Sequence, residues 1–254
     1  MRHDGGHDDS PQNVYDNTQF FAGYSQLERF TSGWGRGMEH AAFLDLVGDV
    51  SGRRVLDLGC GGGQLAFYLA ETGAESVVGV DASERMLEVA RASRAHPRVT
   101  YRREAMEDAD FPPGAFDLVV SSLALHYVRD YAGLIARVAK WLGQAGALVY
   151  STEHPIYTAR SHDEGWVADS EGTRIGWALD RYSEEGPREH QWFVPGVRRY
   201  HRTLSTLLDG LIDAGFVIER IVESTPSEEW LRERPRDADE RRRPMFLLVR
   251  ARVG

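Results

Sequence analysis

The chain reads Val55-Leu56-Asp57-Leu58-Gly59-Cys60-Gly61-Gly62-Gly63-Gln64 over residues 55–64. The apolar start of this stretch predicts a short strand at 54–58, and the residues after the glycines predict a helix at 64–71. The glycines between them let the backbone turn sharply and let a ligand approach main-chain atoms closely. A strand, a glycine loop and a helix in this order indicate a ligand site at the carboxyl end of a strand in an α/β sheet.

The neighbouring segments continue a strand–helix alternation. Short apolar runs predict further strands, and runs that follow a capping residue such as Ser83 predict the helices between them. The expected strands are 54–58, 76–80, 99–103, 117–122 and 147–151, and the expected helices are 64–71, 84–93 and 131–142. This is the period of βαβ units, so we expect a Rossmann-like, doubly wound α/β fold with a largely parallel sheet and helices on both faces.

The alternation stops after the fifth strand and resumes near the C-terminus. Residues 152–200 have weak periodicity and several aromatic side chains, so an aromatic-rich lid or insertion is expected there. A helix is expected at 204–214 and strands at 216–222 and 245–252. The link 228–243 holds six acidic and six basic residues and is expected to be a solvated loop.

The same patterns predict the domain organisation. Residues 1–12 are expected to form a disordered leader and residues 13–50, which include a helical stretch at 39–47, an N-terminal helical arm or lid. Residues 51–254 are expected to form the main domain, with the insertion on its substrate side.

Composition restricts the function classes. The chain has 254 residues and a net charge of −9 at pH 7, and an acidic surface disfavours nucleic-acid binding because contacts to phosphate dominate that affinity. The sequence shows no apolar run of membrane-spanning length and no signal peptide. Cys60 is the only cysteine, which excludes intramolecular disulfides and thiolate-rich metal sites. We therefore expect a cytoplasmic monomer or homodimer with neither a nucleic-acid nor a membrane partner.

The glycine spacing and two acidic residues bear on the ligand of the loop. The dinucleotide fingerprint is G-x-G-x-x-G, whereas this loop reads G-x-G-G-G. Asp57 stands just before the loop, where it would repel a pyrophosphate and attract an ammonium group. Asp81 ends the next strand, 24 residues later, where a carboxylate can accept hydrogen bonds from ribose hydroxyls. S-Adenosylmethionine fits, because it has an ammonium, a sulfonium and no phosphate; a nicotinamide-dependent oxidoreductase is the alternative.

At these residues the chain resembles the class I S-adenosylmethionine-dependent methyltransferases, and most of all the small-molecule group typified by the ubiquinone and menaquinone biosynthesis enzymes. The resemblance covers residues 50–150 well and 204–252 in outline. Residues 57–63 match the family's first motif, residues 81–86 match the segment that begins with the ribose-binding acid, and residues 121–128 match the loop after strand four. The resemblance implies a seven-stranded sheet whose last strand is antiparallel.

The resemblance also implies a set of cofactor contacts. Met86 should lie near the adenine or the ribose. Glu104 falls where the family usually has an aspartate that contacts the adenine amino group, so it departs from the pattern. Cys60 invites the idea of a nucleophile, but its place within the glycine loop favours packing. The expected cofactor-binding residues are Asp57, Gly59, Cys60, Gly61, Gly63, Asp81, Ala82, Met86, Glu104, Ala105, Met106, Ser121 and Leu123.

The residues after the fourth strand narrow the reaction class. Ser121-Ser122-Leu123-Ala124 stands where amino-methyltransferases acting on DNA bases or glutamine have an Asn/Asp-Pro-Pro-aromatic motif. The region also lacks the cysteine of cytosine C5 enzymes and the acidic cluster of magnesium-dependent catechol enzymes. His162-Asp163-Glu164 looks like a set of metal ligands but stands alone in a loop. We therefore expect no metal.

Four side chains are candidates for the catalytic machinery. A general base is needed only where the nucleophile starts protonated, because positioning supplies much of the acceleration. His154 follows the fifth strand and titrates near neutral pH, so it can act as a base or instead hold its loop to the sheet. His126 follows the fourth strand, His201 is expected to open the helix before strand six, and Tyr24 can close the arm over the cofactor.

The expected reaction is metal-independent methyl transfer from S-adenosylmethionine, which leaves S-adenosylhomocysteine, to an oxygen, nitrogen or carbon atom of a small acceptor. The aromatic insertion favours an apolar or aromatic acceptor, such as a natural-product precursor. A non-methylating reaction on the same fold, such as a cyclisation, is the alternative.

Overall fold

A seven-stranded sheet forms the centre of the computed structural model, which describes residues 11–31, 34, 37–160 and 165–254. The strand order is β10-β11-β5-β4-β1-β2-β3, and β11 runs antiparallel to both of its neighbours. The predicted α/β fold, with a mostly parallel sheet and an antiparallel last strand, is confirmed. The strands are β1 (Arg54–Leu58), β2 (Ser76–Asp81), β3 (Val99–Arg103), β4 (Phe116–Ser122), β5 (Leu142–Glu153), β10 (Phe216–Ser224) and β11 (Phe246–Val253).

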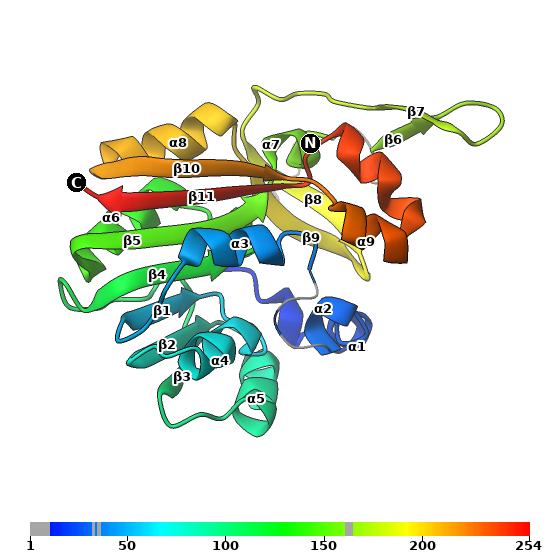
Figure 1. Cartoon of the computed structure of the whole chain (residues 1–254). Helices are drawn as coiled ribbons and strands as arrows, with labels where there is room; N and C mark the ends of the chain where they lie inside the picture. The colour runs from blue at the N-terminus through cyan, green and yellow to red at the C-terminus, as the bar shows by residue number, and fades with distance from the viewer. Residues whose placement is uncertain (1–10, 32–33, 35–36, 161–164) are drawn as a thin grey trace, which may run out of the picture.

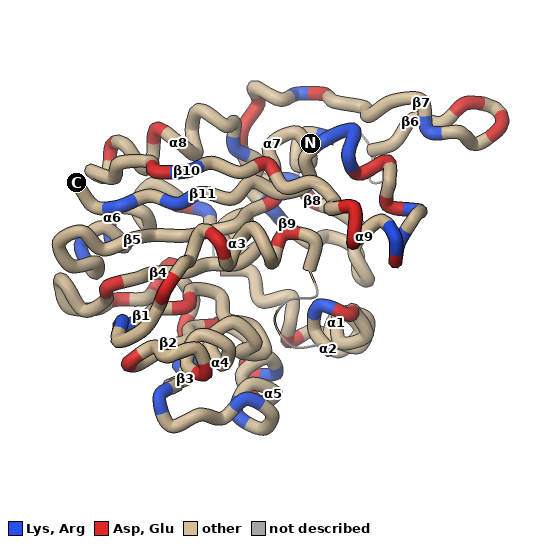
Figure 2. The backbone as a smooth tube through the Cα atoms, in the orientation of Figure 1, with Lys and Arg blue, Asp and Glu red and all other residues tan. Residues whose placement is uncertain are grey.

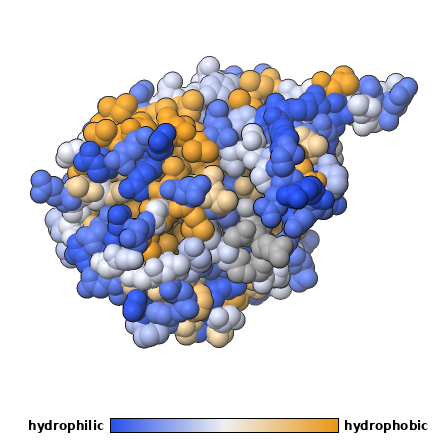
Figure 3. All heavy atoms as spheres, in the orientation of Figure 1, coloured by the Kyte–Doolittle hydropathy of each residue, from blue (hydrophilic) through white to orange (hydrophobic). Residues whose placement is uncertain are grey.

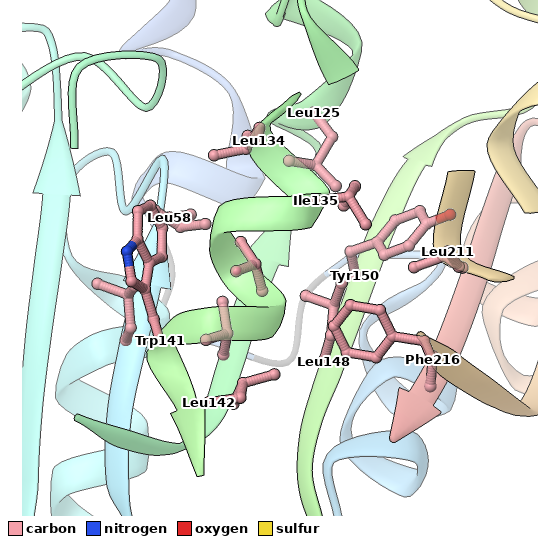
Figure 4. Packing of buried hydrophobic residues seen from close by; sticks show 14 of the residues in the cluster. Leu58, Leu125, Leu134, Ile135, Trp141, Leu142, Leu148, Tyr150, Leu211 and Phe216 are labelled. Carbon is pink, nitrogen blue, oxygen red and sulfur yellow. The ribbon is translucent and has the colours of Figure 1, made fainter. Parts of the chain in front are cut away.

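Helices cover both faces of this sheet because each has one apolar stripe. On one face, α6 (Tyr131–Trp141) and α8 (Leu204–Asp213) pack on the strands; Figure 4 shows Leu134 and Trp141 of α6 and Leu211 of α8 in this cluster. On the other face, α3 (His40–Val47) and α4 (Gln64–Glu71) form a second apolar cluster with the strands. A further helix, α5 (Glu84–Ser93), packs against β2 and β3.

The elements outside this sandwich gather at one end of the sheet. Figure 1 shows them at the end toward which the β5 arrow points, the carboxyl end of the parallel strands. They come from the N-terminal arm, from the link after β4 and from the insertion. They are η1 (Val14–Asp16), α1 (Thr18–Tyr24), α2 (Glu28–Thr31), η2 (Leu125–Tyr127), α7 (Pro155–Thr158), β6 (Trp166–Ala168), β7 (Arg174–Trp177), β8 (Gly186–Trp192) and β9 (Val194–His201).

Two expectations for the insertion and the leader need correction. Residues 186–201 form an antiparallel hairpin, β8–β9, and residues 166–177 contain a second, shorter pair of strands. His201 therefore ends β9 rather than opening a helix, and Thr203 is the N-cap of α8. Of the expected leader only residues 11 and 12 are described, and Gln12 is held there by two hydrogen bonds between its side chain and the backbone of Arg198.

The expected loop at 228–243 is also wrong, because this link is helical. It forms α9 (Glu228–Glu233) and η3 (Pro235–Arg242), with Ser227 as the N-cap of α9. Trp230 holds the two short helices together. Its indole N–H donates to Asp237 at 2.9 Å, and the guanidinium of Arg234 lies 4.1 Å from its ring centroid. Figure 2 shows the acidic and basic residues interspersed along α9.

The surface has an apolar region and a hydrophilic region on the face shown in Figure 3. Apolar residues gather over β10 and β11, whereas the surface over α9 is hydrophilic. Among the exposed large apolar residues are Val217 and Ile221 of the edge strand β10. Within the described part of the chain, no helix has both the length and the apolar character to span a membrane.

Candidate active site

A cavity of about 430 Å³ lies at the carboxyl ends of β1, β2, β4 and β5. Its walls come from the glycine loop after β1, the residues after β3 and β4, the N-terminal arm and the β8–β9 hairpin. A smaller hollow adjoins it where Tyr24, Arg29, Gly59, Gly61 and Ser122 line both. The volume is that of a small-molecule site.

The glycine loop has the backbone shape that its sequence predicts. Gly59, Gly61 and Gly63 have φ values of 74°, 51° and 80°, a region that side-chain-bearing residues rarely adopt. A Cβ on Gly59 would lie 2.4 Å from the Cβ of Ala124, whereas one on Gly61 would meet nothing within 4 Å. The loop therefore leaves open space beside Gly61, where a ligand can approach the main chain.

Asp57 and Asp81 end up close together at this loop. Asp57 is buried, and its Oδ2 has no hydrogen-bond partner among the described residues. Burial and the neighbouring Asp81 raise the pKa of Asp57 to about 8, and burial raises the pKa of Asp81 to about 6. A buried acid with an unpartnered oxygen, beside the half-buried Asp81, favours a cationic ligand, because a positive charge would stabilise both carboxylates.

Asp81 also orders the loop. Its Oδ2 accepts a hydrogen bond from the backbone N–H of Gly61 at 2.8 Å, and its Oδ1 accepts one from Ser83 at 2.9 Å. Each carboxylate oxygen can accept a second hydrogen bond, so Asp81 can still receive two hydroxyl groups from the cavity that it lines.

Most of the other expected cofactor contacts line one of the two spaces. Gly59, Gly61, Asp81, Ala82, Met86, Ala105, Met106 and Leu123 line the cavity, and Asp57 and Cys60 line the adjoining hollow. Burial raises the pKa of the Cys60 thiol well above its usual range, and a Cβ on Gly79 would lie 3.0 Å from its Sγ. Cys60 is therefore a packing residue without thiolate character.

Three expected contacts lie outside both spaces. Glu104 pairs with Arg102 at 2.8 Å, and Glu107, three residues later, lines the cavity instead. The Ser121 hydroxyl is buried and donates to the carbonyl of Leu58 at 2.8 Å, and the next residue, Ser122, reaches the cavity. Gly63 packs under Tyr101, whose hydroxyl oxygen would lie 2.4 Å from a Cβ there. Gly63 therefore permits the start of α4 rather than a ligand contact.

His154 does not line the cavity, contrary to expectation. Its Nδ1 accepts a hydrogen bond from the backbone N–H of Ile156 at 3.1 Å and caps α7. Its Nε2 then carries the proton and lies 2.9 Å from Glu223 Oε1 of β10. Both nitrogens are engaged in holding the loop after β5 to the sheet, which was the alternative role considered for this residue.

His201 is also turned away from the cavity. It is fully buried, with Nε2 2.8 Å from the carbonyl oxygen of Tyr182 and Nδ1 2.6 Å from Thr158 Oγ1. These contacts tie β9 to α7 and to the segment before β8. We therefore assign His201 a structural role.

His126 and Tyr24 do line the cavity. His126 is buried, and its Nδ1 lies 3.5 Å from Thr152 Oγ1. Burial and the positive charges of Arg199 and other basic groups lower its pKa well below the usual range. His126 is therefore a neutral imidazole at neutral pH. The ring of Tyr24 packs edge-on against Trp192, so the arm and the hairpin meet over the cavity.

Several residues that line the cavity were not expected from the sequence, and most of them are charged or aromatic and lie at its far end, away from the glycine loop. The buried pair Glu153 and Arg199 has an N–O distance of 2.8 Å. Glu153 ends β5, and its place at a strand end was a usable signal; Arg199 comes from the hairpin, which was not foreseen. The missed lining residues are Arg29, Glu153, Tyr157, Arg160, Gln191, Trp192 and Arg199.

The described residues hold no group of three or more His, Cys, Asp or Glu side chains arranged to bind a metal. The sequence cluster His162-Asp163-Glu164 lies outside the described residues.

The fold and the cavity together define an α/β protein with a small-molecule site, flanked by two acidic residues, at the carboxyl edge of its sheet. The family model described as "Methyltransferase domain" matches residues 55–146. The solved structure of an S-adenosylmethionine dependent methyltransferase from Mesorhizobium loti has 44% sequence identity and a TM-score of 0.81, and the match covers 87% of this chain and 100% of that one. The chain belongs to the S-adenosylmethionine-dependent methyltransferases.

Two further relatives extend this comparison. An uncharacterized protein of Haemophilus influenzae is 34% identical over 248 residues, which are 94% of this chain and 96% of that protein. A ubiquinone biosynthesis O-methyltransferase of Neisseria meningitidis is 38% identical over 114 residues, 43% of this chain and about half, 48%, of that enzyme. The protein is thus a methyltransferase with S-adenosylmethionine as its cofactor, and the oxidoreductase and cyclisation alternatives are not favoured.

Proposed function

We propose that this enzyme transfers the methyl group of S-adenosylmethionine to an oxygen, nitrogen or carbon atom of a small-molecule acceptor, without a metal. One observation carries the proposal: a single cavity joins the acid-flanked glycine loop to a chamber of aromatic side chains in which His126 is buried as a neutral base. The ubiquinone biosynthesis O-methyltransferase named above gives oxygen as a precedent for the accepting atom.

The residues of the glycine-loop half fit S-adenosylmethionine group by group. Asp57 would hold the ammonium, because its unpartnered Oδ2 borders the hollow. Arg29 lines the same hollow and would hold the carboxylate of the methionine part. Asp81 would accept the two ribose hydroxyls, while Met86 and Met106 would pack on the adenine.

The bound cofactor supplies a methyl group that its positive sulfur makes electrophilic. The protein must then position the acceptor, exclude water and receive a proton where the acceptor starts protonated. His126 is the side chain best placed to receive that proton, since it is neutral and lines the cavity. Tyr24 and Trp192 would keep water out, because the arm and the hairpin meet through them.

Enclosure and charge favour a small acceptor over a macromolecule. The chamber is walled by the hairpin and the arm, and the chain has a net charge of −9, which opposes binding to nucleic acid. We also propose that the enzyme is cytoplasmic, since Cys60 is the only cysteine of the chain, and that it acts as a monomer or a homodimer.

Isotopically labelled S-adenosylmethionine tests this function directly. Metabolite extracts incubated with the purified protein and the labelled cofactor should yield a product heavier by the labelled methyl group, together with S-adenosylhomocysteine, by mass spectrometry. The Asp81→Ala variant is the matched control and should give much less of both at the same, sub-saturating concentration of the cofactor. Binding of the cofactor without any labelled product across extracts of several bacteria would contradict methyl transfer.

A further inference from the structure

The far end of the cavity holds an excess of positive charge. Arg160 follows α7 and Arg199 lies in β9, and both line the cavity together with one carboxylate, Glu153, at the end of β5. Arg199 is buried, and its Nη1 lies 2.8 Å from Glu153 Oε1 and 3.1 Å from Glu153 Oε2. These two charges therefore compensate each other.

Arg160 has no such partner among the described carboxylates. Its Nη1 donates to the carbonyl oxygen of Tyr157 at 3.3 Å, its Nη2 lies 3.4 Å from His190 Nδ1, and its Nε is buried without an acceptor among the described residues. Burial raises the pKa of Glu153, and the charges of Arg199 and then Arg160 oppose that rise, so Arg160 acts on this carboxylate without pairing with it. A partly buried guanidinium without a counter-ion is costly, and an anion in the chamber would offset that cost.

The remaining cations of the cavity do not change this balance. Arg29 lines both spaces and its charge also acts on Glu153, but it is compensated by Glu39, which lies 2.9 Å away. The two acids Asp81 and Glu107 belong to the adenine side, after β2 and β3. The acceptor end thus contains two guanidinium groups and one carboxylate, an excess of one positive charge.

Aromatic rings lie beside both guanidinium groups. The Cζ of Arg160 lies 4.4 Å from the ring centroid of Tyr157, and the Cζ of Arg199 lies 5.2 Å from that of Trp192. Stacking on these rings fixes the planes of the guanidinium groups and leaves their edges to form hydrogen bonds. Tyr15 and Tyr127 line the same cavity, so an apolar body can pack beside the charged end.

We infer that the methyl acceptor is an amphipathic monocarboxylate whose carboxylate binds Arg160 and Arg199 and whose apolar body packs on Tyr157 and Trp192. This inference rests on the proposed function. The single negative charge of a monocarboxylate matches the excess of one positive charge in the chamber, whereas a phosphate ester would bring more negative charge than the chamber balances. The carboxylate serves as the anchor, since hydrogen bonds from arginine lower its nucleophilicity, and the accepting atom lies elsewhere on the molecule.

Calorimetry on the full chain saturated with S-adenosylhomocysteine tests the inference with four matched probes. They are 3-phenylpropionate, its neutral amide, 3-phenylpropylamine and 2-phenylethylphosphonate. The carboxylate should bind at least about tenfold more tightly than the amide, a difference of about 1.4 kcal/mol, and the amine should bind most weakly. Equal affinity for acid and amide, no binding of the carboxylate at millimolar concentration, or tighter binding of the phosphonate would overturn the inference.

Variants of Arg160 test whether this residue gives the preference for a carboxylate over an amide. Arg160→Gln should remove the advantage of carboxylate over amide, and Arg160→Lys should keep part of it, because the charge stays and the planar fork is lost. Arg236→Gln, at an exposed position of η3, is the control and should keep all of it. An unchanged preference in a folded Arg160→Gln protein would refute the assignment. Binding of S-adenosylhomocysteine tells failure of the proposed function from failure of this inference. A wild-type protein that does not bind S-adenosylhomocysteine would contradict the proposed function. A wild-type protein that binds it but shows no preference for the carboxylate would contradict only this inference.

Discussion

The carboxylate of Asp81 accepts a hydrogen bond from the backbone N–H of Gly61 at 2.8 Å, so the end of β2 fixes the loop that follows β1. The two strands pair in parallel, with Asp57 opposite Gly79, which brings both acidic strand ends to the same loop. The second oxygen of Asp81 accepts from Ser83 at 2.9 Å and orders the start of α5. One side chain thus shapes the loop and faces the cavity.

Replacement of Asp81 by alanine should weaken cofactor binding. The variant loses the ribose acceptor and the tie to Gly61, so the affinity for S-adenosylhomocysteine should fall by about 1.5–3 kcal/mol, the range for hydrogen bonds to a charged group. Calorimetry measures this directly. Asp213→Ala, at an exposed position at the end of α8, is the control. Unchanged affinity in a folded Asp81→Ala protein would remove Asp81 from the ribose site.

Replacement of Asp57 by asparagine should raise the stability of the protein and weaken cofactor binding. Its pKa is raised from 3.8 to about 8 by burial and Asp81, so the folded state disfavours its ionised form. The contribution of Asp57 to the stability of the cofactor-free protein is fully present below pH 3.8, and it is lost as the pH rises toward about 8. Asp57→Asn removes the penalty, so above pH 8 the variant should unfold at higher denaturant concentration yet bind S-adenosylhomocysteine more weakly.

Asp45→Asn, at an exposed position of α3, is the control for Asp57 and should change neither property. Binding of a cation also favours the ionised acids, so wild-type affinity should rise with pH as Asp81 and then Asp57 ionise, up to the range of about 7.7–8.0 where an α-amino group loses its own charge. A variant Asp57→Asn with wild-type affinity and the same pH dependence would show that the ammonium binds elsewhere.

The sequence predicted the cofactor half of the site because that half is local. Asp57, the glycines and Asp81 sit at the ends of adjacent parallel strands, and such ends always meet at one edge of the sheet. Leu123 and Met106 follow from the same rule, since they come directly after β4 and β3. Glu104 differs from these residues, because its side chain pairs with Arg102 at 2.8 Å and does not line the cavity.

The acceptor half could not be predicted in the same way. Arg199 meets Glu153 across 46 residues, and only the folding of the β8–β9 hairpin over the sheet brings them together. The error on His154 has the same origin: a histidine after a strand end looks available, but its partner Glu223 comes from β10, 69 residues later. The link 228–243 reads as a loop because its helices are fixed by Trp230 rather than by an apolar stripe.

Cofactor binding and turnover should be insensitive to chelation. The described residues hold no candidate metal cluster, and the proposed site assigns each charged group of the cofactor to a side chain without a metal. Titrations with S-adenosylhomocysteine in the presence and absence of EDTA should coincide, and added Mg²⁺ should change neither affinity nor labelled product. Loss of activity with EDTA and its return with Mg²⁺ would reveal a metal site.

Alanine variants of His154 and His126 should separate a structural role from a catalytic one. His154→Ala removes the N-cap of α7 and the link to Glu223, so the free energy of unfolding should fall by about 0.5–2 kcal/mol, the range for a lost cap. Turnover per folded molecule should change little, because His154 lies outside the cavity. Denaturant titration and the labelled-methyl assay together measure both effects.

His126→Ala should have the opposite signature. If the acceptor starts protonated, loss of the base should lower kcat by about 10²–10⁴-fold, with the affinity for S-adenosylhomocysteine nearly unchanged because the glycine loop and Asp81 remain.

Since burial holds the pKa of His126 well below its usual value of 6.5, the imidazole stays neutral as the pH falls through 6.5, and wild-type turnover should not decrease there because of His126. The unfolded chain binds the proton first, so acid costs stability below pH 6.5 at this group, and the loss should shrink in His126→Ala. Full turnover in His126→Ala would remove His126 from the mechanism as a base. An inactive His154→Ala protein of normal stability would restore His154 to the mechanism.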